Sequence, residues 1–355
     1  MYRWVYKSSS EMIVSIQKTI DILKKVHQSE LEVGLRNAAC HSQFFVHTHT
    51  TSKVCLFLHG FTAAPYQFQP LGKALFNKGY NVLVPLQPGH GIAGDWNRNN
   101  PPPLSTDIKT YQDFVLEWVE IAQTLAEEVV IGGLSTGGTL AAWLALNYPQ
   151  KVDRALLFTP YLGNYNIIFD LLIKILPIYF EWFNKDASGN FGYKGFRVPA
   201  LRIFLELGEQ LLKQAQNHPS APILMVCSES DRAVSRSKQQ DFFTTVVKQQ
   251  PKSWYYCFDD SLEIEHRMMT KLEDNDYEEL VITLAKAFIG SDLTWRQFQD
   301  MAINIVQGEA YEKIQQELNL DPQTSQYLSA MMTQSFGCDN LKCINPQGIG
   351  VNSKH

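Results

Sequence analysis

A single serine lies among glycines in the segment VVIGGLSTGG, which ends at Gly138. Ser135 follows an apolar run typical of a buried strand and precedes a helical pattern, TLAAWLALNYP. The residues Gly133 to Gly137 fit Gly-x-Ser-x-Gly, and a strand that turns sharply into a helix needs glycines there for the backbones to pass. We therefore expect Ser135 to be an exposed nucleophile. A glycine turn that only packs helix on strand is the alternative.

Two further segments supply the groups that a nucleophilic serine requires. ILMVCSESDRAVS predicts a strand and a loop with Asp231, and WYYCFDDSLEIEHRMMT predicts a strand and a loop with His266. A serine hydroxyl needs a histidine to take its proton, and the histidine needs a carboxylate to fix its tautomer. Because both loops follow strands, we expect them at the same sheet edge as Ser135, in the chain order nucleophile, acid, histidine.

The segment LFLHGFTAAP offers donors for the negative charge that acyl transfer develops on oxygen. Gly60 allows a close approach of the loop, so the backbone N–H of Phe61 can face a reacting carbonyl. The N–H of Thr136, directly after the serine, supplies a second donor. Taken alone, HGFT also fits an ordinary turn at the end of a strand.

Short apolar, β-branched runs alternate with longer helical patterns along the chain, which predicts an α/β fold with a mainly parallel sheet. Several runs are apolar on both faces, as expected of strands covered by helices on both sides. The segment SQFFVHTHTTSKVCLFL looks like a hairpin that leads into the first of these strands. The expected strands are VCLFLHG from Val54, NVLVPL from Asn81, VVIGG from Val129, RALLFTP from Arg154, ILMVCSES from Ile223 and WYYCF from Trp254.

Three regions fall outside the repeating pattern and divide the chain. Residues 1–40 predict an N-terminal helical extension, with a helix from about Glu11 to Leu35. Residues 41–290 form the expected core, which an insertion at about 161–215 interrupts with the apolar stretch NIIFDLLIKILPIYFEWF. Residues 291–355 predict a C-terminal extension of one or two helices and a tail.

Four separated motifs, in order, resemble the α/β hydrolases, and specifically their carboxylesterase and monoacylglycerol-lipase-like branch. They are LHGFTAAPYQFQPLGKALFNKGYNVLVPLQPGHG, GLSTGG, the SESD loop and EHRMM, within a resemblance that covers about residues 44–290. The resemblance implies an α/β-hydrolase fold with helices on both faces of the sheet and a helical cap. It also implies a triad of Ser135, Asp231 and His266, with Phe61 and Thr136 as oxyanion donors.

Other titratable residues near the expected site offer alternatives for the acid and the base of the triad. Many relatives have a short glycine-containing turn before the catalytic histidine, whereas this chain has DDSLEIEH, which places several carboxyl groups close to His266. Asp231 is the preferred acid because of its position in the loop after a strand, and Glu229 is its rival. His90 lies in PGHG, which matches a structural turn of the family, so we expect it to be scaffold rather than base.

The insertion at 161–215 lies where this fold carries a cap over the active site. Its apolar stretch is broken by few charges, and a core helix or an interfacial helix that rests on a membrane are the alternatives to a cap. An apolar cap predicts recognition of an acyl chain. Phe169 and Trp182 are the cap residues that we expect to contact it.

Composition narrows the classes of partner. The hydrophobic share of 45% suits a folded core, and a net charge of −5 without a long basic run argues against a nucleic acid partner. No apolar run reaches the roughly 18 residues of a membrane span, and the N-terminus has no secretory signal pattern. We therefore expect a cytoplasmic protein, for which peripheral membrane contact stays open.

Neither the cysteines nor the histidines predict a metal site. The close pair in CDNLKC, Cys338 and Cys343, has no second pair or neighbouring histidines, so a zinc site is not expected. His47 and His49 share one face of a strand, but no third ligand is evident. We expect reduced thiols, no metal and no cofactor.

These features favour a serine hydrolase of carboxylic esters, with a small acyl ester or lipid-like substrate of medium or long chain. A thioesterase or acyltransferase stays open, because the motifs do not separate ester from thioester or water from another alcohol. A non-catalytic ligand-binding or partner-docking protein would not need all three triad groups. The natural substrate and the oligomeric state are left open.

Overall fold

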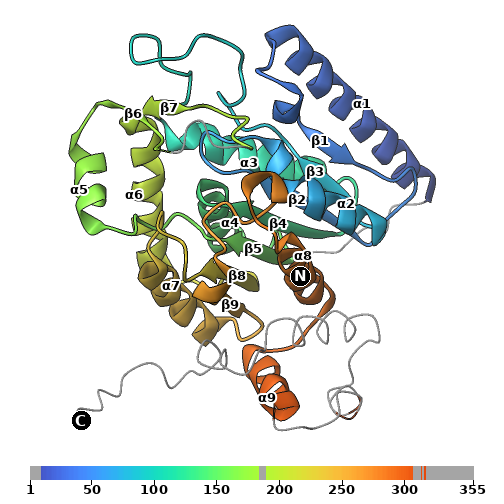
Figure 1. Cartoon of the computed structure of the whole chain (residues 1–355). Helices are drawn as coiled ribbons and strands as arrows, with labels where there is room; N and C mark the ends of the chain where they lie inside the picture. The colour runs from blue at the N-terminus through green and yellow to red at the C-terminus, as the bar shows by residue number, and fades with distance from the viewer. Residues whose placement is uncertain (1–8, 184–188, 307–312, 314–315, 317–355) are drawn as a thin grey trace, which may run out of the picture.

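The computed structural model describes residues 9–183, 189–306, 313 and 316, and it centres on a seven-stranded sheet (Figure 1). The strand order is β1-β3-β2-β4-β5-β8-β9, and every pairing is parallel except that of β1 with β3. The predicted mainly parallel sheet is confirmed. Its strands are β1 Gln43–Phe45, β2 Lys53–Leu58, β3 Asn81–Val84, β4 Glu128–Leu134, β5 Arg154–Phe158, β8 Ile223–Ser228 and β9 Trp254–Phe258.

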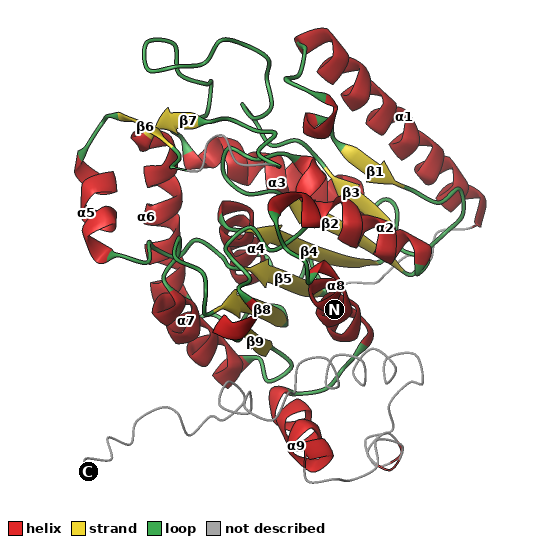
Figure 2. Ribbon diagram, viewed as in Figure 1, coloured by secondary structure: helices red, strands yellow, loops and turns green. Residues whose placement is uncertain are grey.

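Helices cover both faces of this sheet, as Figure 2 shows. Along β2, Val54, Leu56 and Leu58 belong to one hydrophobic core, whereas Cys55 and Phe57 belong to the other. This alternation explains why the strand is apolar at every position. The first core includes side chains of α3 Ile108–Ala122, α4 Thr136–Asn147, α6 Val198–Gln214 and α7 Arg236–Gln249, and the second includes those of α2 Gln69–Asn77 and α8 Glu278–Gly290.

The expected hairpin before β2 is wrong. β1 pairs with β3, in the register Phe44 opposite Leu83, and not with the strand that follows it in the sequence. Both edges of β2 are already occupied by parallel partners, β3 and β4. The free edge of β3 is therefore where the hydrogen-bonding groups of β1 find partners.

Both terminal extensions pack against the core where the structure describes them. The N-terminal helix α1 spans Ser9–Val33 and buries Ile16 and Leu23. The C-terminal helix α9 spans Trp295–Val306, and the ring of its Phe298 lies 4.6 Å from that of Trp254 in β9, centre to centre. The second expected C-terminal helix, SQYLSAMMTQSF, lies outside the described residues.

The insertion forms a small lobe above one side of the sheet. It contains α5 Ile167–Ile175 and a two-stranded antiparallel pair, β6 Tyr179–Glu181 and β7 Gly195–Arg197, and it leads into α6. α5 ends because Leu176 is extended, as a residue before a proline prefers. Most apolar side chains of α5 are exposed, so the alternative of a buried core helix does not fit the structure.

No helix among the described residues is long and apolar enough to cross a membrane. The described cysteines, Cys40, Cys55, Cys227 and Cys257, are all buried and form no disulfide. Cys338 and Cys343 lie outside the described residues.

Candidate active site

Ser135 stands at the junction of β4 and α4 in a strained backbone conformation. Its φ of 56° and ψ of −118° lie in a region that non-glycine residues rarely adopt. The glycines around it are sterically required. A Cβ on Gly133 would lie 2.2 Å from the carbonyl carbon of Gly137, and a Cβ on Gly137 would lie 2.1 Å from the carbonyl oxygen of Leu58. Three backbone segments, the end of β4, the start of α4 and the end of β2, thus approach one another too closely for side chains at these two positions.

His266 lies in the loop after β9 and is bound by a buried carboxylate. Its Nδ1 is 2.8 Å from Oδ2 of Asp231. The other carboxylate oxygen of Asp231 accepts the backbone N–H of Ala233 at 2.8 Å, which fixes the carboxylate in its loop. Burial lowers the pKa of His266, but the charge of Asp231 and its hydrogen bond outweigh this effect, so the pKa lies above its ordinary value.

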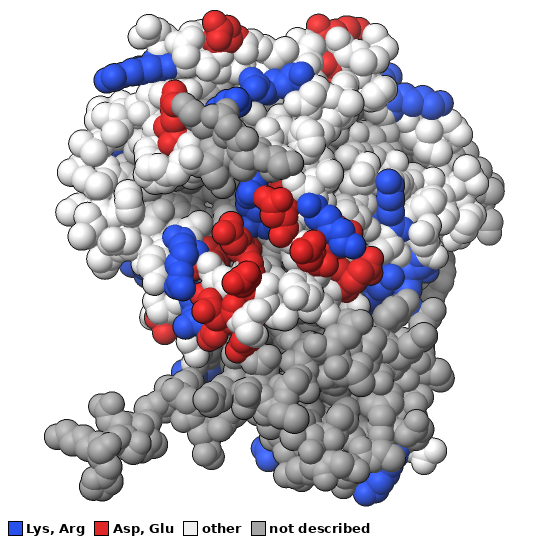
Figure 3. Space-filling model, in the orientation of Figure 1, with Lys and Arg blue, Asp and Glu red and all other residues white. Residues whose placement is uncertain are grey.

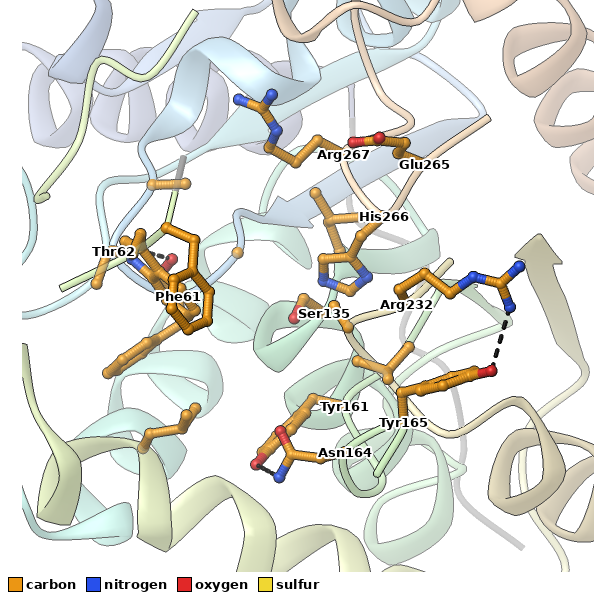
Figure 4. A pocket seen from close by; sticks show the side chains of 18 of the residues that line it. Phe61, Thr62, Ser135, Tyr161, Asn164, Tyr165, Arg232, Glu265, His266 and Arg267 are labelled. Atoms are coloured by element: carbon orange, nitrogen blue, oxygen red, sulfur yellow. Dashed lines mark hydrogen bonds between the residues drawn. The ribbon is translucent and has the colours of Figure 1, made fainter. Parts of the chain in front are cut away.

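Ser135 and His266 line the same cavity, although they are far apart in the sequence. Figure 4 shows the imidazole of His266 beside Ser135, with the Phe61 and Thr62 loop on another side. Because Nδ1 faces Asp231, the other ring nitrogen, Nε2, is left to serve the serine hydroxyl. This arrangement has the chemical parts of an activated nucleophile: hydroxyl, base and a carboxylate that orients the base.

The other carboxylates considered from the sequence have different partners. Glu229 accepts a hydrogen bond from Nη1 of Arg236 at 2.6 Å. Asp260 accepts from the hydroxyl of Ser230 at 2.8 Å. Among the described residues, Asp231 is therefore the carboxylate that hydrogen-bonds the imidazole.

Two backbone amides are available near the serine. Thr136 is the first residue of α4, so its N–H has no carbonyl acceptor within the helix. Among the hydrogen bonds of the described residues, none uses the N–H of Phe61. Phe61 lines the cavity that holds Ser135, and Thr136 directly follows that serine in the chain.

The cavity has a volume of about 750 Å³ and is lined mainly by apolar side chains. The cap supplies one wall through Phe169 and Ile173 of α5 and through Phe180 and Trp182 beyond it. Trp182 is also anchored, because its indole N–H donates to the hydroxyl of Thr62 at 2.8 Å. The two cap residues singled out from the sequence, Phe169 and Trp182, thus both line the cavity.

The remaining histidines lie outside this arrangement. His90 is buried, and burial lowers its pKa to about 4, so it stays neutral inside the fold. Nε2 of His47 donates to the carbonyl oxygen of Phe76 at 3.2 Å, and its ring stacks on that of the same residue. One group of three candidate metal ligands exists among the described residues: His27, Glu30 and His41 place their ligand atoms within 4.8 Å of one another. None of the three lines the cavity.

The sequence analysis missed two polar residues of the cavity wall, Gln67 and Glu273. Both are buried and line the cavity. Glu273 lies in the segment TKLEDND, where its charged neighbours suggest an ordinary solvated turn. No spacing in the sequence distinguishes it from them.

Comparison with known proteins gives three kinds of similarity. Residues 53–217 match the family model described as the α/β hydrolase fold. A thermostable monoacylglycerol lipase of Bacillus sp. (strain H-257) is 32% identical over 98 residues, which are 27% of this chain and 36% of that protein. The chain therefore aligns with about a third of the length of this curated relative.

Solved structures extend the likeness of fold to most of the chain. A soluble variant of monoglyceride lipase from Saccharomyces cerevisiae superposes with a TM-score of 0.57 at 15% identity, over 71% of this chain and 92% of that one. A structure from a study of two metagenome-derived lipolytic enzymes superposes with a TM-score of 0.56 at 17% identity, over 71% and 98% of the two chains. At such identities these structures establish the shared fold alone.

Proposed function

We propose that this chain, an α/β hydrolase similar in sequence to a monoacylglycerol lipase, is a serine hydrolase that cleaves carboxylic esters of medium or long acyl chains. The observation that supports this most directly is the strained Ser135 beside an imidazole that a buried carboxylate holds at 2.8 Å. Ser135 and His266 line a mainly apolar cavity. A protein of the same fold that only bound a ligand would not need a hydroxyl, an imidazole and a carboxylate in this arrangement.

In the proposed reaction, Oγ of Ser135 attacks the ester carbonyl carbon while Nε2 of His266 takes the hydroxyl proton. Asp231 keeps Nδ1 protonated and stabilises the imidazolium that forms. The backbone N–H groups of Phe61 and Thr136 donate to the oxyanion. His266 then protonates the leaving alcohol, and a water molecule, activated by the same imidazole, releases the carboxylic acid from the acyl-enzyme. Every step uses groups of this chain and water.

The character of the cavity supports an acyl chain as the recognised group. The insertion contributes Phe169, Ile173, Phe180 and Trp182 to its wall, whereas Glu265 and Arg267, which flank His266 in the sequence, are charged residues that also line it. Such a division suits a substrate with one apolar arm and one polar reacting end. A thioester would fit the same groups, so the acyl donor has to be distinguished by assay.

Peripheral contact with a lipid surface is a further part of the proposal. The cap exposes an apolar surface on and beside α5, where Ile167 is 74% and Phe183 is 90% exposed. Figure 3 shows that the face over α5 carries few charged side chains, in contrast to the mixed acidic and basic surface below it. An apolar surface of this kind beside a cavity opening allows a lipid substrate to enter without crossing water.

The test is hydrolysis of p-nitrophenyl esters from acetyl to palmitoyl by the native protein and by Ser135→Ala. We expect activity that rises with chain length to a medium- or long-chain optimum, and a loss of at least about a thousandfold in the variant. The corresponding acyl thioesters, and an added alcohol as acceptor, separate the thioesterase and acyltransferase alternatives. A folded native protein with no more activity than Ser135→Ala on any acyl donor would favour a binding role.

A further inference from the structure

A chain of buried hydrogen bonds holds the backbone of Gly60, the residue before Phe61. The side-chain oxygen of Gln67 accepts the backbone N–H of Gly60 at 2.8 Å. The side-chain nitrogen of Gln67 donates to Oε1 of Glu273 at 2.9 Å. Gln67 is 3% and Glu273 is 4% exposed, and they come from two short 3₁₀ helices, Pro65–Phe68 and Lys271–Glu273.

A carboxylate at the end of this chain gives the amide of Gln67 one orientation. An ionised carboxylate only accepts hydrogen bonds, so Gln67 must turn its NH₂ group toward Glu273 and its oxygen toward Gly60. The hydroxyl of Tyr66 donates to the same carboxylate at 2.9 Å. Burial raises the pKa of Glu273 to about 7, against the opposing effect of these two hydrogen bonds. At pH 8 the carboxyl is therefore mainly ionised.

The N–H of Gly60 belongs to the peptide group that precedes Gly60. The next peptide group, between Gly60 and Phe61, is held through the carbonyl oxygen of Gly60. The carbonyl oxygen of Gly60 accepts the N–H of Ala63 at 3.2 Å and lies 2.9 Å from Nδ1 of His59. The other ring nitrogen of His59 accepts the N–H of Gln87 at 3.0 Å, so Nδ1 carries the proton and donates. In a trans peptide the N–H points opposite to the C=O. Holding Gly60 at both its N–H and its C=O therefore aims the N–H of Phe61.

We propose that Gln67 and Glu273 are positioning residues that keep the Phe61 N–H directed at the acyl oxygen during catalysis. The inference rests on the proposed function, because the direction of this amide matters only to a reaction that develops charge on that oxygen. Neither side chain needs to touch the substrate. Gln67 acts through the backbone of Gly60. Glu273 acts through Gln67, and its charge also helps to raise the pKa of His266.

The pair allows a test in which the two side chains exchange roles. In the double variant Gln67→Glu/Glu273→Gln, the carboxylate at 67 accepts from Gly60 and from the NH₂ group at 273, whose oxygen accepts from Tyr66. Because Oε1 of Glu273 accepts from both Tyr66 and Gln67, the NH₂ group of the new glutamine takes the place of Oε2, which lies 3.2 Å from Nε2 of Gln67 in the native protein. The single charge is kept. Gln67→Met and Glu273→Met keep the approximate size of each side chain but remove these bonds, and Glu273→Asp is a milder change for use if a methionine variant does not fold.

We expect each methionine variant at pH 8 to lower kcat by about 10- to 100-fold, because loss of one oxyanion donor costs about 100- to 1,000-fold. KM should change less than about threefold, since ground-state binding lies elsewhere in the cavity. The role-exchanged variant should recover kcat to within about fivefold of native. The kcat of Glu273→Asp should lie between those of the methionine variants and of the role-exchanged variant, about tenfold below native.

A matched control is Glu30→Gln, which alters another buried carboxylate that accepts a backbone N–H, that of Ser42, outside the cavity. Its kcat should stay within about twofold of native. A loss equal to that of Glu273→Met would overturn the proposal, because it would show a general effect of disturbing buried carboxylates. Native kcat in both methionine variants would overturn it as well.

Amide hydrogen exchange of residues 59–64 tests the positioning role without an activity assay. We expect faster exchange in the methionine variants and native exchange in the role-exchanged variant. Unchanged exchange in the methionine variants would contradict the positioning role even if the native protein hydrolysed no ester. Failure of the proposed function would instead appear as equal activity of the native protein and Ser135→Ala, so the two failures are distinguishable.

Discussion

At the scale of single residues, the central feature is the asymmetry of the two oxygens of Asp231. One oxygen binds backbone amides of its own loop, and the other binds Nδ1 of His266. The first contact fixes the carboxylate, and the second fixes the imidazole. Glu229, two residues earlier, is directed to Arg236 instead. A shift of two positions along a loop thus separates a carboxylate that hydrogen-bonds the imidazole from one that pairs with an arginine.

Asp231→Asn tests this assignment. An asparagine amide can donate to Nδ1 and leave Nε2 protonated, so the imidazole could no longer take the serine proton. We expect kcat to fall by about a thousandfold or more. Glu229→Gln is the control, and its kcat should stay within about twofold of native because exposed ion pairs contribute little. Comparable losses in the two variants would contradict the preference for Asp231.

The raised pKa of His266 predicts the direction of the pH dependence. The base must be neutral to accept a proton, so kcat/KM should rise with pH as His266 deprotonates. Since the charge and hydrogen bond of Asp231 raise the pKa, the midpoint should lie above the ordinary value for histidine, about 6.5. Residual activity of Asp231→Asn should have its midpoint at lower pH. A midpoint that does not move would show that Asp231 does not control the imidazole.

At the scale of elements, the junction of β4 and α4 packs closely against the end of β2. Gly137 faces the carbonyl oxygens of Leu58 and His59, so the start of α4 lies directly against the end of β2. This contact brings the start of α4, with the N–H of Thr136, close to the loop that follows β2 and carries Phe61. Close packing of backbone therefore sets the distance between the two amides that we propose as oxyanion donors.

Gly137→Ala should be strongly destabilising, because its Cβ would lie 2.1 Å from the Leu58 oxygen. We expect a loss of about 3 kcal/mol or more in the free energy of unfolding, measured by urea denaturation. Gly79→Ala is the matched control: Gly79 has a φ of +95°, but no atom lies within 4 Å of its added Cβ. Its cost should be only the backbone strain, about 1–2 kcal/mol. Equal costs would argue against the steric explanation.

The cap helix α5 combines two surfaces that substitutions can separate. Phe169 lines the cavity, whereas Ile167 is exposed and does not. Phe169→Asp should lower hydrolysis of soluble long-chain esters by about tenfold more than that of acetyl esters. Ile167→Asp should leave both rates within about twofold, but both variants should weaken sedimentation with neutral lipid vesicles. Equal losses on short and long esters for Phe169→Asp would count against an acyl site beneath the cap.

At the scale of the whole molecule, the C-terminal extension is part of the folded unit where it is described. Phe298 and Met301 of α9 are buried in the same core as β9 and α8. The indole N–H of Trp254 donates to the carbonyl of Leu293 at 2.9 Å, which joins the end of α8 to the sheet. The helix lies on the sheet at β9, remote from the cap.

Phe298→Ala tests how far this helix stabilises the core. Removing a buried phenyl ring should lower the free energy of unfolding by about 3–5 kcal/mol. Because α9 does not line the cavity, kcat of the folded variant should stay within about twofold of native. Arg296→Ala, on the exposed side of the same helix, should change stability by less than about 0.5 kcal/mol. An unchanged unfolding midpoint for Phe298→Ala would show that α9 adds nothing to the core.

The fold was predictable because its signals are local. Each strand is marked by its own apolar run, and alternation with helical patterns implies parallel strands with loops at a common edge. The pairing of β1 was not predictable in this way. It depends on which strand edge is left free after β2 has taken its two parallel partners.

The sequence by itself therefore determined the parallel sheet, the strand-to-helix turn at Ser135 and the loops that carry Asp231 and His266. Strand polarity alone places these loops at one edge. Which carboxylate reaches the imidazole, and the contact of Gln67 with Glu273 across 206 residues of sequence, depend on the tertiary structure. The physical reason is that a hydrogen bond requires two groups to meet within about 3 Å. For segments far apart in the chain, that distance is set only when the whole core has packed.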